Sequence, residues 1–249
     1  MFRCLRRLHT VPRLNQNFSP EGVKGLMSPA QFDLAWTQQQ GYLTSKLSLA
    51  TAETEFEGRT PFAMAISAAK DPLLQDTFFH ASMAHNNHLF FEQLTNSTSE
   101  SGILKAEKEL KPELYQKIIS TFGSMEDFKK DMISAANNLE GNGWIFLVED
   151  VNKNLLIISS NNAGTPYNFT QNQSTDMNIP LASNEILNVE KNKQRAKSNE
   201  KDWTLPLLVI NVWQHAYLLD YGIVGKEQYL QNVWDCIDWK VINRRIFSV

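Results

Sequence analysis

The spacing of apolar residues changes midway along the chain, and this change constrains the fold more than any other feature of the sequence. In the first half, apolar side chains recur at helical intervals over residues 28–55 and again over residues 76–94. Ser28 followed by Pro29 is typical of a helix start. The sequence therefore predicts a helical hairpin that ends at the polar connector of residues 95–102.

The second half carries shorter apolar runs that are typical of strands. Residues 144–149 and 155–160 are joined by a few polar residues and predict a hairpin, and residues 205–212 predict a third strand. Helical patterns flank these runs at residues 112–122, 125–139 and 227–246. We therefore predict an α+β fold, in which an N-terminal helical hairpin is followed by a small three-stranded antiparallel sheet flanked by helices. A stretch rich in Asn, Gln, Lys and Ser, at about 167–202, is interpreted as a polar insertion.

Composition narrows the class of protein. The 249 residues are 42% hydrophobic, which is enough to build a packed core, and the net charge of −3 gives no overall attraction to nucleic acid. The longest strongly apolar stretch, Leu205–Trp213, is far shorter than the roughly 20 residues that span a membrane. With Cys4 and Cys236 as the only cysteines, the sequence excludes a disulfide framework and a zinc site built from several thiolates.

The N-terminus is basic. Residues 1–20 contain four arginines and no acidic residue, a composition typical of a mitochondrial presequence, although a basic arm on the mature protein is the alternative. Without those arginines, the net charge of −3 becomes −7, so the remaining chain would be distinctly acidic. We predict three regions: the presequence or basic arm at 1–20, a helical hairpin domain at 21–98, and an α+β domain at 99–249.

Three segments carry sequence patterns that indicate a particular family, beyond the helix or strand periodicity they show. They read AHNNHLFFEQL (84–94), FGSMEDFKKDMISAANNLEGNGWIFLVED (122–150) and LPLLVINVWQHAYLLDYG (205–222), the last followed by YLQNVWDCIDWKVINRR. These segments resemble the iron/manganese superoxide dismutases, and the resemblance extends over most of the chain outside the polar insertion. It implies that family's fold.

The resemblance also implies where a metal would be bound. The family's metal is held by three imidazoles and one carboxylate, and the corresponding residues here are Ala35, His88, Asn211 and His215. Alanine has no donor atom, and asparagine offers a neutral oxygen in place of a carboxylate. We therefore expect no catalytic residue, no bound metal and no cofactor, and we predict that the protein is not an enzyme.

The residues that surround the metal in the family also differ here. The substrate-gate tyrosine corresponds to Leu43, its neighbouring histidine to Gln39, and the glutamine that tunes the metal-bound solvent to Ala84 or Ala163. The glutamate that crosses the family's dimer interface corresponds to Gln214. A symmetric, charge-assisted bridge between two copies is therefore not expected.

Three histidines allow more than one interpretation. His88 and His215 are expected to form a buried pair satisfied by hydrogen bonds rather than a metal site. His85 and His88, three residues apart, form a zinc clamp in a less favoured interpretation. The candidate assembly contacts are Gln214, Tyr217 and the basic run Lys191, Lys193, Arg195 and Lys197.

One group within the family matches this pattern. The segments HNNHLF, GWIFLVED, SNNAGTPY and DWTLPLL resemble the dismutase-derived proteins of the fungal mitochondrial ribosome's small subunit, and in particular the shorter of the two. This resemblance implies a structural role in that subunit, in the mitochondrial matrix, with the related protein as heterodimer partner and with other ribosomal proteins and ribosomal RNA as further contacts. The alternatives are an active mitochondrial dismutase with an altered ligand set and a free-standing binding protein.

Overall fold

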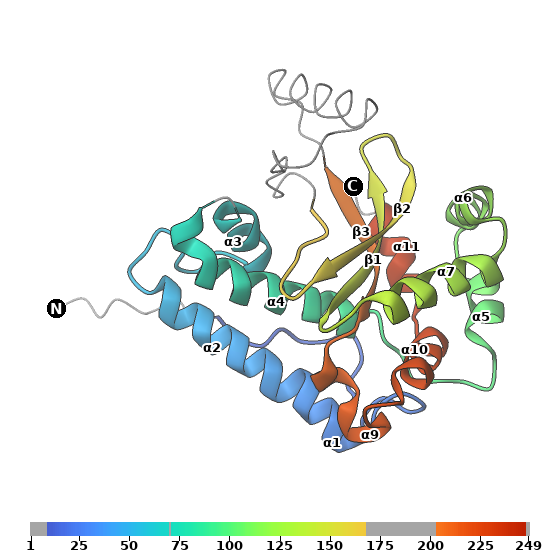
Figure 1. Cartoon of the computed structure of the whole chain (residues 1–249), viewed down its shortest axis with the longest axis horizontal. Helices are drawn as coiled ribbons and strands as arrows, with labels where there is room; N and C mark the ends of the chain where they lie inside the picture. The colour runs from blue at the N-terminus through green and yellow to red at the C-terminus, as the bar shows by residue number, and fades with distance from the viewer. Residues whose placement is uncertain (1–8, 70, 168–202, 248–249) are drawn as a thin grey trace.

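The computed structural model describes residues 9–69, 71–167 and 203–247. Helices of the first half lie beside a three-stranded sheet that is flanked by the helices of the second half (Figure 1). This arrangement confirms the predicted α+β fold. No helix in the described ranges is long and apolar enough to cross a membrane.

The first predicted helix is present and has a wider turn within it. It is made of α1 (Pro29–Phe32), the π-helical segment η1 (Asp33–Gln38) and α2 (Gln39–Thr51), so it ends four residues before the predicted end at 55. The Ser28 hydroxyl accepts a hydrogen bond of 3.2 Å from the Gln31 N–H, which satisfies one of the free donors at the helix start.

The second predicted helix, α4 (Gln75–Glu92), is confirmed and packs against α2. Between them lies a helix that the sequence analysis missed, α3 (Pro61–Ala68), which leads into the short segment η2 (Pro72–Leu74). The helix α3 starts as helices often do, because the Thr60 hydroxyl accepts a hydrogen bond of 3.2 Å from the Ala63 N–H.

The second half begins with three helices that precede the sheet. Two were predicted, α6 (Pro112–Phe122) and α7 (Met125–Asn138), whereas α5 (Gly102–Glu109) was missed. The Ser124 hydroxyl accepts from the Asp127 N–H at 3.0 Å and so caps α7, as the sequence suggested.

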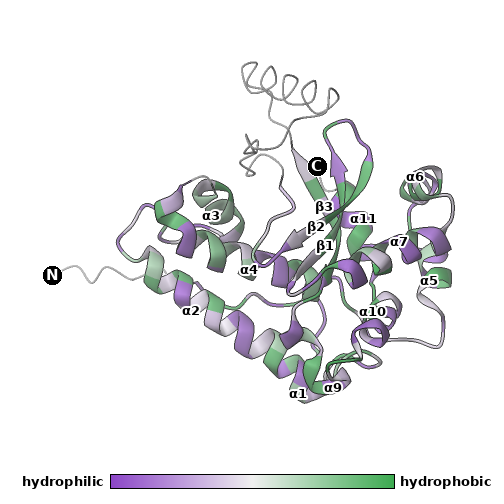
Figure 2. Ribbon diagram, in the orientation of Figure 1, coloured by the Kyte–Doolittle hydropathy of each residue, from purple (hydrophilic) through white to green (hydrophobic). Residues whose placement is uncertain are grey.

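All three predicted strands are present. They are β1 (Gly143–Asp150), β2 (Leu155–Asn161) and β3 (Thr204–Asn211), in the order β2-β1-β3 with both pairs antiparallel. The central strand β1 is buried on both faces because helices cover the sheet from both sides. Figure 2 shows apolar residues along β1 and β3, whereas β2 is only partly buried.

The chain after the sheet is helical but less continuous than predicted. It contains η4 (Gln214–Ala216), α9 (Leu218–Tyr221), α10 (Lys226–Asp235) and α11 (Trp239–Phe247). The break between α10 and α11 is stabilised from outside, because the Asp238 N–H donates to the Gln93 carbonyl at 2.8 Å. Gln93 and Asp238 are far apart in the chain, so a local sequence pattern does not predict this contact.

One hydrophobic core runs through both predicted domains. It includes Phe32 and Phe91 from the helical hairpin and Trp144, Trp234 and Trp239 from the α+β half. The two halves of the chain therefore share their buried surface.

The side chain of Arg245, on α11, joins the halves by hydrogen bonds as well. Its guanidinium donates to the Leu207 carbonyl on β3 and to the Leu89 carbonyl on α4. It also lies 3.4 Å from the Glu92 carboxylate, which offsets the cost of burying the charge.

Residues close to the predicted boundaries at 20 and 167 contact the rest of the protein. The chain already contacts the body before residue 20, because the His9 N–H donates to Ser48 Oγ at 2.8 Å and Phe18 packs edge-on against Phe32. Tyr167, at the predicted start of the insertion, has a buried side chain. Residues 1–8 and 168–202, which hold most of the proposed presequence arginines and the proposed insertion, lie outside the described residues.

Candidate functional site

Three of the residues at and beside the expected metal position meet between the two halves of the molecule. Ala35 lies on the first helix, Asn87 on α4 and Asn211 at the end of β3, and all three are fully buried. The Asn87 Nδ2 group donates to the Ala35 carbonyl at 3.3 Å, and the Asn211 Nδ2 group donates to Asn87 Oδ1 at 3.5 Å.

Neighbouring groups complete a network of hydrogen-bonded amides. Gln40 Oε1 accepts from Asn87 at 3.0 Å, and its Nε2 donates to the Ala84 carbonyl at 3.0 Å. Asn211 Oδ1 accepts from the Trp213 N–H at 2.9 Å. We call Gln40, Asn87 and Asn211 the amide network, and each of their side-chain oxygens accepts a hydrogen bond.

The amide network does not fit a redox-active mononuclear metal. Such a site needs anionic or imidazole donors, whereas the three side chains here are neutral and hydrogen-bonded to one another or to the backbone. The described residues hold no group of three or more His, Cys, Asp or Glu side chains that could bind a metal ion. No reaction step through a metal follows from this arrangement.

His88 is not the α4 side chain that joins the other ligand positions. Its ring packs against Trp36, with the ring centroids 6.1 Å apart, while Asn87 contacts Ala35 and Asn211. Residues next to each other on a helix point about 100° apart, so a shift of one residue moves a side chain to another face. The structure therefore has Asn87 where the sequence analysis expected His88.

His215, which corresponds to the last ligand of the family, lies in η4, shortly after the end of β3. Its Nε2 atom is buried without a hydrogen bond, and the ring lies 5.5 Å from that of Trp213. Burial lowers the pKa of His215 to about 4, so the imidazole is neutral at physiological pH. No hydrogen bond joins His215 to His88, although both are described.

His85 contacts Tyr167 rather than forming a zinc clamp with His88. A hydrogen bond of 2.7 Å joins His85 Nε2 to the Tyr167 hydroxyl, and Phe62 from α3 packs on both rings. Burial, helped by the charges of His88 and Arg245, lowers the pKa of His85 to about 3. The neutral imidazole therefore accepts this bond from the tyrosine.

The side chains expected around a family active site offer no proton-transfer group. Leu43, Ala84 and Ala163 are buried and apolar, and Gln39 is a neutral amide. The described residues at these positions therefore supply neither a substrate gate that can donate a proton nor an amide aimed at a metal-bound solvent.

The candidate assembly contacts differ in their exposure. Gln214 is exposed, whereas Tyr217 is 5% exposed and stacks on Tyr229 at 5.1 Å, so its ring serves the core rather than the surface. The basic residues Lys191, Lys193, Arg195 and Lys197 lie outside the described residues.

An exposed apolar group that the sequence analysis missed follows Gln214. It consists of Leu219, Ile223 and Val224, which are 59%, 87% and 96% exposed. The segment that carries it is well anchored: the Leu219 N–H donates to Gln31 Oε1 at 3.0 Å, and the Tyr221 hydroxyl donates to the Leu26 carbonyl at 2.6 Å. Aliphatic side chains this exposed are uncommon and mark contact surfaces when they cluster.

Comparison with known proteins identifies the family. A family model for the C-terminal domain of iron/manganese superoxide dismutases matches residues 110–183 and 170–245. The small ribosomal subunit protein mS43 of Schizosaccharomyces pombe is 32% identical over 96% of this chain and 84% of its own length. The small ribosomal subunit protein mS42 of the same organism is 31% identical over 75% of this chain and 74% of its own length.

An enzyme is also among the relatives. The iron superoxide dismutase of Bacteroides fragilis is 28% identical over 96% of this chain and 99% of its own length. This match covers the helical half as well as the sheet, in agreement with the shared core described above. The chain therefore belongs to the iron/manganese superoxide dismutase family, and within that family it is related to the small ribosomal subunit proteins mS43 and mS42.

Proposed function

We propose that the protein is a structural constituent of the small subunit of the mitochondrial ribosome, located in the mitochondrial matrix, and that it has no enzymatic activity. The amide network carries this proposal, because it fills the expected metal position with neutral, hydrogen-bonded side chains. The relationship to mS43 and mS42, both small ribosomal subunit proteins, supports the ribosomal part. The arginine-rich N-terminus supports mitochondrial targeting.

Sedimentation tests the ribosomal role. A tagged copy of the full chain, expressed in a fungus whose own copy is deleted, should comigrate with the small ribosomal subunit when mitochondrial extracts are separated on a gradient. It should remain there at moderate salt and leave only under conditions that strip other ribosomal proteins. Migration as a small free species would favour the free-standing binding protein instead.

The active dismutase is the second candidate, and the match to the B. fragilis enzyme over nearly its whole length is the observation in its favour. Metal analysis separates the two. We expect less than about 0.1 iron or manganese per chain after purification from metal-supplemented cells, since the neutral amides make a poor site for these ions. Stoichiometric metal with dismutation above that of the free ion would contradict our proposal.

The related dismutase-like subunit is the proposed partner, bound through the face that carries Gln214 and the exposed Leu219, Ile223 and Val224. Apolar side chains on an anchored segment lose little conformational entropy on binding, which favours their use as contact residues. The replacement Ile223→Asp should abolish copurification of the related subunit, while Lys46→Asp, on the exposed side of α2, should not.

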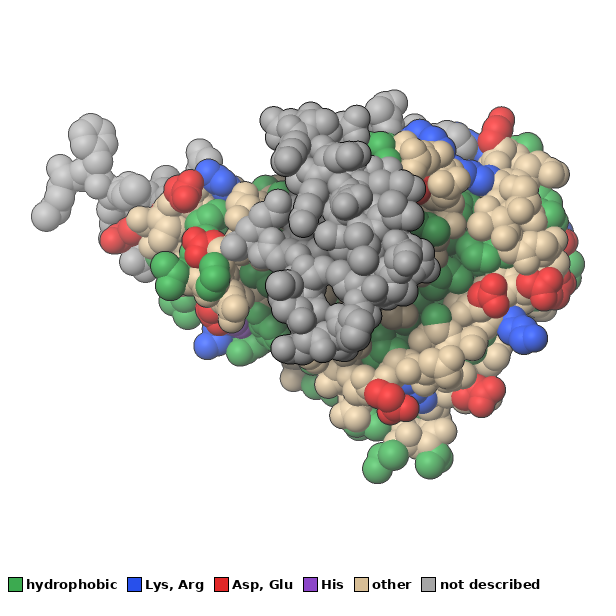
Figure 3. Space-filling model, turned by 45° about the horizontal axis from the view of Figure 1, so that its top comes forward, with side chains coloured by type: hydrophobic (Ala, Val, Ile, Leu, Met, Phe, Trp, Pro, Cys, Tyr) green, Lys and Arg blue, Asp and Glu red, His purple; other side chains and the backbone are tan. Residues whose placement is uncertain are grey.

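Ribosomal RNA is proposed as a minor contact of the described residues. Among the coloured side chains on the face in Figure 3, basic groups are scattered among acidic ones and form no continuous basic surface. Binding to the phosphate backbone requires clustered Lys and Arg. The basic run at 191–197 is therefore the segment we propose for any RNA contact.

The match to mS43 covers 96% of this chain, whereas the match to mS42 covers 75%. We therefore propose that this chain occupies the place in the small subunit that corresponds to mS43.

A further inference from the structure

The two outer edges of the sheet are treated differently. On β3, the side chain of Gln93 bonds both backbone groups of Val209, and Arg245 donates to the carbonyl of Leu207. This edge is thus closed by the side chains of Gln93, directly after α4, and Arg245, on α11. The strand β2 lies at the opposite edge, and within the described part of the chain it pairs only with β1.

The hairpin fixes which backbone groups of β2 point outward. The Asp150 N–H donates to the Asn154 carbonyl at 3.0 Å, and from there the paired residues of an antiparallel ladder alternate between bonded and non-bonded positions. Leu156, Ile158 and Ser160 therefore bond to β1. The N–H and C=O groups of Leu155, Ile157 and Ser159 point away from β1, and among the described residues no hydrogen bond reaches them. Leu155 is only 2% exposed, so Ile157 and Ser159 are the accessible positions of this edge.

This edge also lacks the features that usually prevent strand addition. Natural edge strands carry charged side chains, proline or bulges that discourage pairing with another chain. The segment 155–161 reads LLIISSN and contains no charged residue, proline or glycine, and Leu156 is 43% exposed. The opposite edge strand, β3, contains Pro206 in addition to its side-chain cover.

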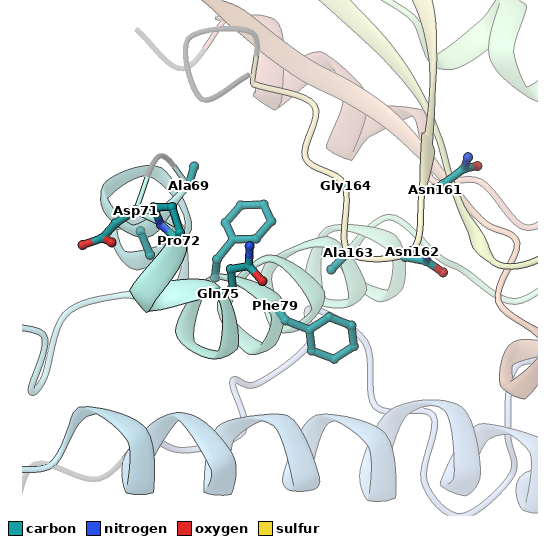
Figure 4. Close-up of a pocket in the computed structure, with 11 residues that line it drawn as sticks. Ala69, Asp71, Pro72, Gln75, Phe79, Asn161, Asn162, Ala163 and Gly164 are labelled. Atoms are coloured by element: carbon teal, nitrogen blue, oxygen red, sulfur yellow. The ribbon is translucent and has the colours of Figure 1, made fainter. Parts of the chain in front are cut away.

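A pocket of about 450 Å³ begins where β2 ends. It lies between α4 and the segment that follows β2, and Figure 4 shows Gln75 and Ala163 facing each other across it, while the amides of Asn161 and Asn162 point away. Phe78 and Phe79 contribute apolar wall, and Asp71 is the single charged residue of the lining. The pocket therefore suits an apolar side chain and repels a phosphate.

We propose that the outer edge of β2 binds an extended segment of a neighbouring protein, which adds a fourth strand to the sheet and inserts an apolar side chain into the pocket beside Asn161. Backbone hydrogen bonds to Ile157 and Ser159 supply affinity, and the pocket supplies selectivity, as in other cases of strand addition. A protein segment fits better than RNA because neither β2 nor the pocket offers a positive charge. This proposal rests on the ribosomal role, since that assembly supplies the neighbour.

Hydrogen exchange on the full chain, free and within purified small subunits, tests the proposal. In the free protein, the amides of Ile157 and Ser159 should exchange much faster than those of Ile158 and Ser160, which bond to β1. In the assembled subunit, the exchange of Ile157 and Ser159 should slow by at least about tenfold. Equal exchange of these two amides in both states would overturn the proposal.

Matched variants add a second readout. Ser159→Pro removes an outward N–H and should leave the melting temperature of the isolated protein within about 2 °C, whereas Ser160→Pro removes a bond to β1 and should lower it clearly. Ser159→Ala is the control for loss of the hydroxyl. Ser159→Pro should weaken incorporation into the small subunit at least about fivefold in competition with the unaltered chain, and Ser159→Ala should not.

Photo-crosslinking identifies the occupant. A crosslinker at position 156, on the exposed side of β2, should capture one protein segment of the small subunit. Capture of RNA, or of a second copy of this chain, would overturn the proposal. Failure of the whole chain to sediment with the subunit would instead contradict the proposed function, so the two failures are distinguishable.

Discussion

The amide network and the aromatic core around Trp234 lie in the same fold but are held together in different ways, the first by hydrogen bonds and the second by ring packing. At the network, the expected imidazole and carboxylate donors are absent, and neutral side chains bond one another. Around Trp234, the rings of Phe128 and Trp239 pack edge-on at 5.4 Å, as a tightly packed core requires. The comparison teaches that polar groups at the centre of this fold satisfy one another by hydrogen bonds where the family has metal-binding donors.

Removal of a ring from the core should have the largest effect. Trp234 is fully buried, and its replacement by alanine leaves a cavity that its neighbours cannot fill, so we expect Trp234→Ala to lower the free energy of unfolding by about 3–5 kcal/mol. Urea denaturation measures this change. Tyr42→Ala, at an exposed position on α2, is the control, and a similar loss there would show that the core is not the main source of stability.

Restoring the carboxylate should destabilise the network rather than rebuild a site. In Asn211→Asp, a buried charge replaces an amide that donates to Asn87, and we expect a loss of about 2–3 kcal/mol at pH 7. Denaturation at pH 4, where the carboxyl is more often protonated, should show a smaller difference from the unaltered protein. Uptake of stoichiometric manganese by this variant would mean that the position still accepts a metal.

His215, whose buried Nε2 atom has no hydrogen-bond partner among the described residues, predicts sensitivity to acid. The pKa of His215 is about 4 in the folded protein and near 6.5 in the unfolded chain, so its contribution is fully present above pH 6.5 and is lost as the pH falls toward 4. We expect His215 to account for a loss on the order of 2 kcal/mol between pH 7 and pH 4.

The variant His215→Gln isolates this effect, because glutamine does not titrate. Its free energy of unfolding should depend less on pH over the same range, even if it is lower at pH 7. An unchanged pH dependence would assign the acid sensitivity to other groups, with His85 the first to examine, since its pKa is also low in the folded protein.

Deletion of residues 188–199 should have the smallest effect on stability. The flanking segments are held together, because the Thr204 hydroxyl donates to the Pro166 carbonyl and Tyr167 is anchored against His85. We expect a change of less than about 0.5 kcal/mol in the free energy of unfolding, together with weaker incorporation into the small subunit. Normal incorporation would show that the deleted stretch makes no necessary contact.

The sequence predicts most of the framework because long periodic segments carry their own signal. The strands and the helices α4, α6 and α7 follow from local patterns. The helix α3 was missed because PFAMAISA is apolar on nearly every face, although Thr60 and Pro61 gave a start signal. The break before α11 depends on the contact between Asp238 and Gln93, which is distant in sequence.

The site is harder to predict because one residue of helix phase changes which side chain faces inward. The sequence analysis predicted His88 as the counterpart of a metal ligand. The side chains of α4 that face inward are instead those of Ala84, Asn87 and Phe91, all fully buried. Asn87 lies three residues after Ala84 and four before Phe91, a helical spacing that predicts an inward-facing side chain. The unpartnered Nε2 of His215 has no sequence signal, because it depends on what the rest of the fold fails to bring near it.

The buried guanidinium of Arg245 couples the unfolding of the two halves of the molecule. The side chain of Arg245 donates hydrogen bonds both to β3 and to the last part of α4. We therefore expect the two halves of the chain to unfold together rather than one after the other. Heating should give a single calorimetric peak, and a chain that lost its last helix would release the hairpin and the sheet together.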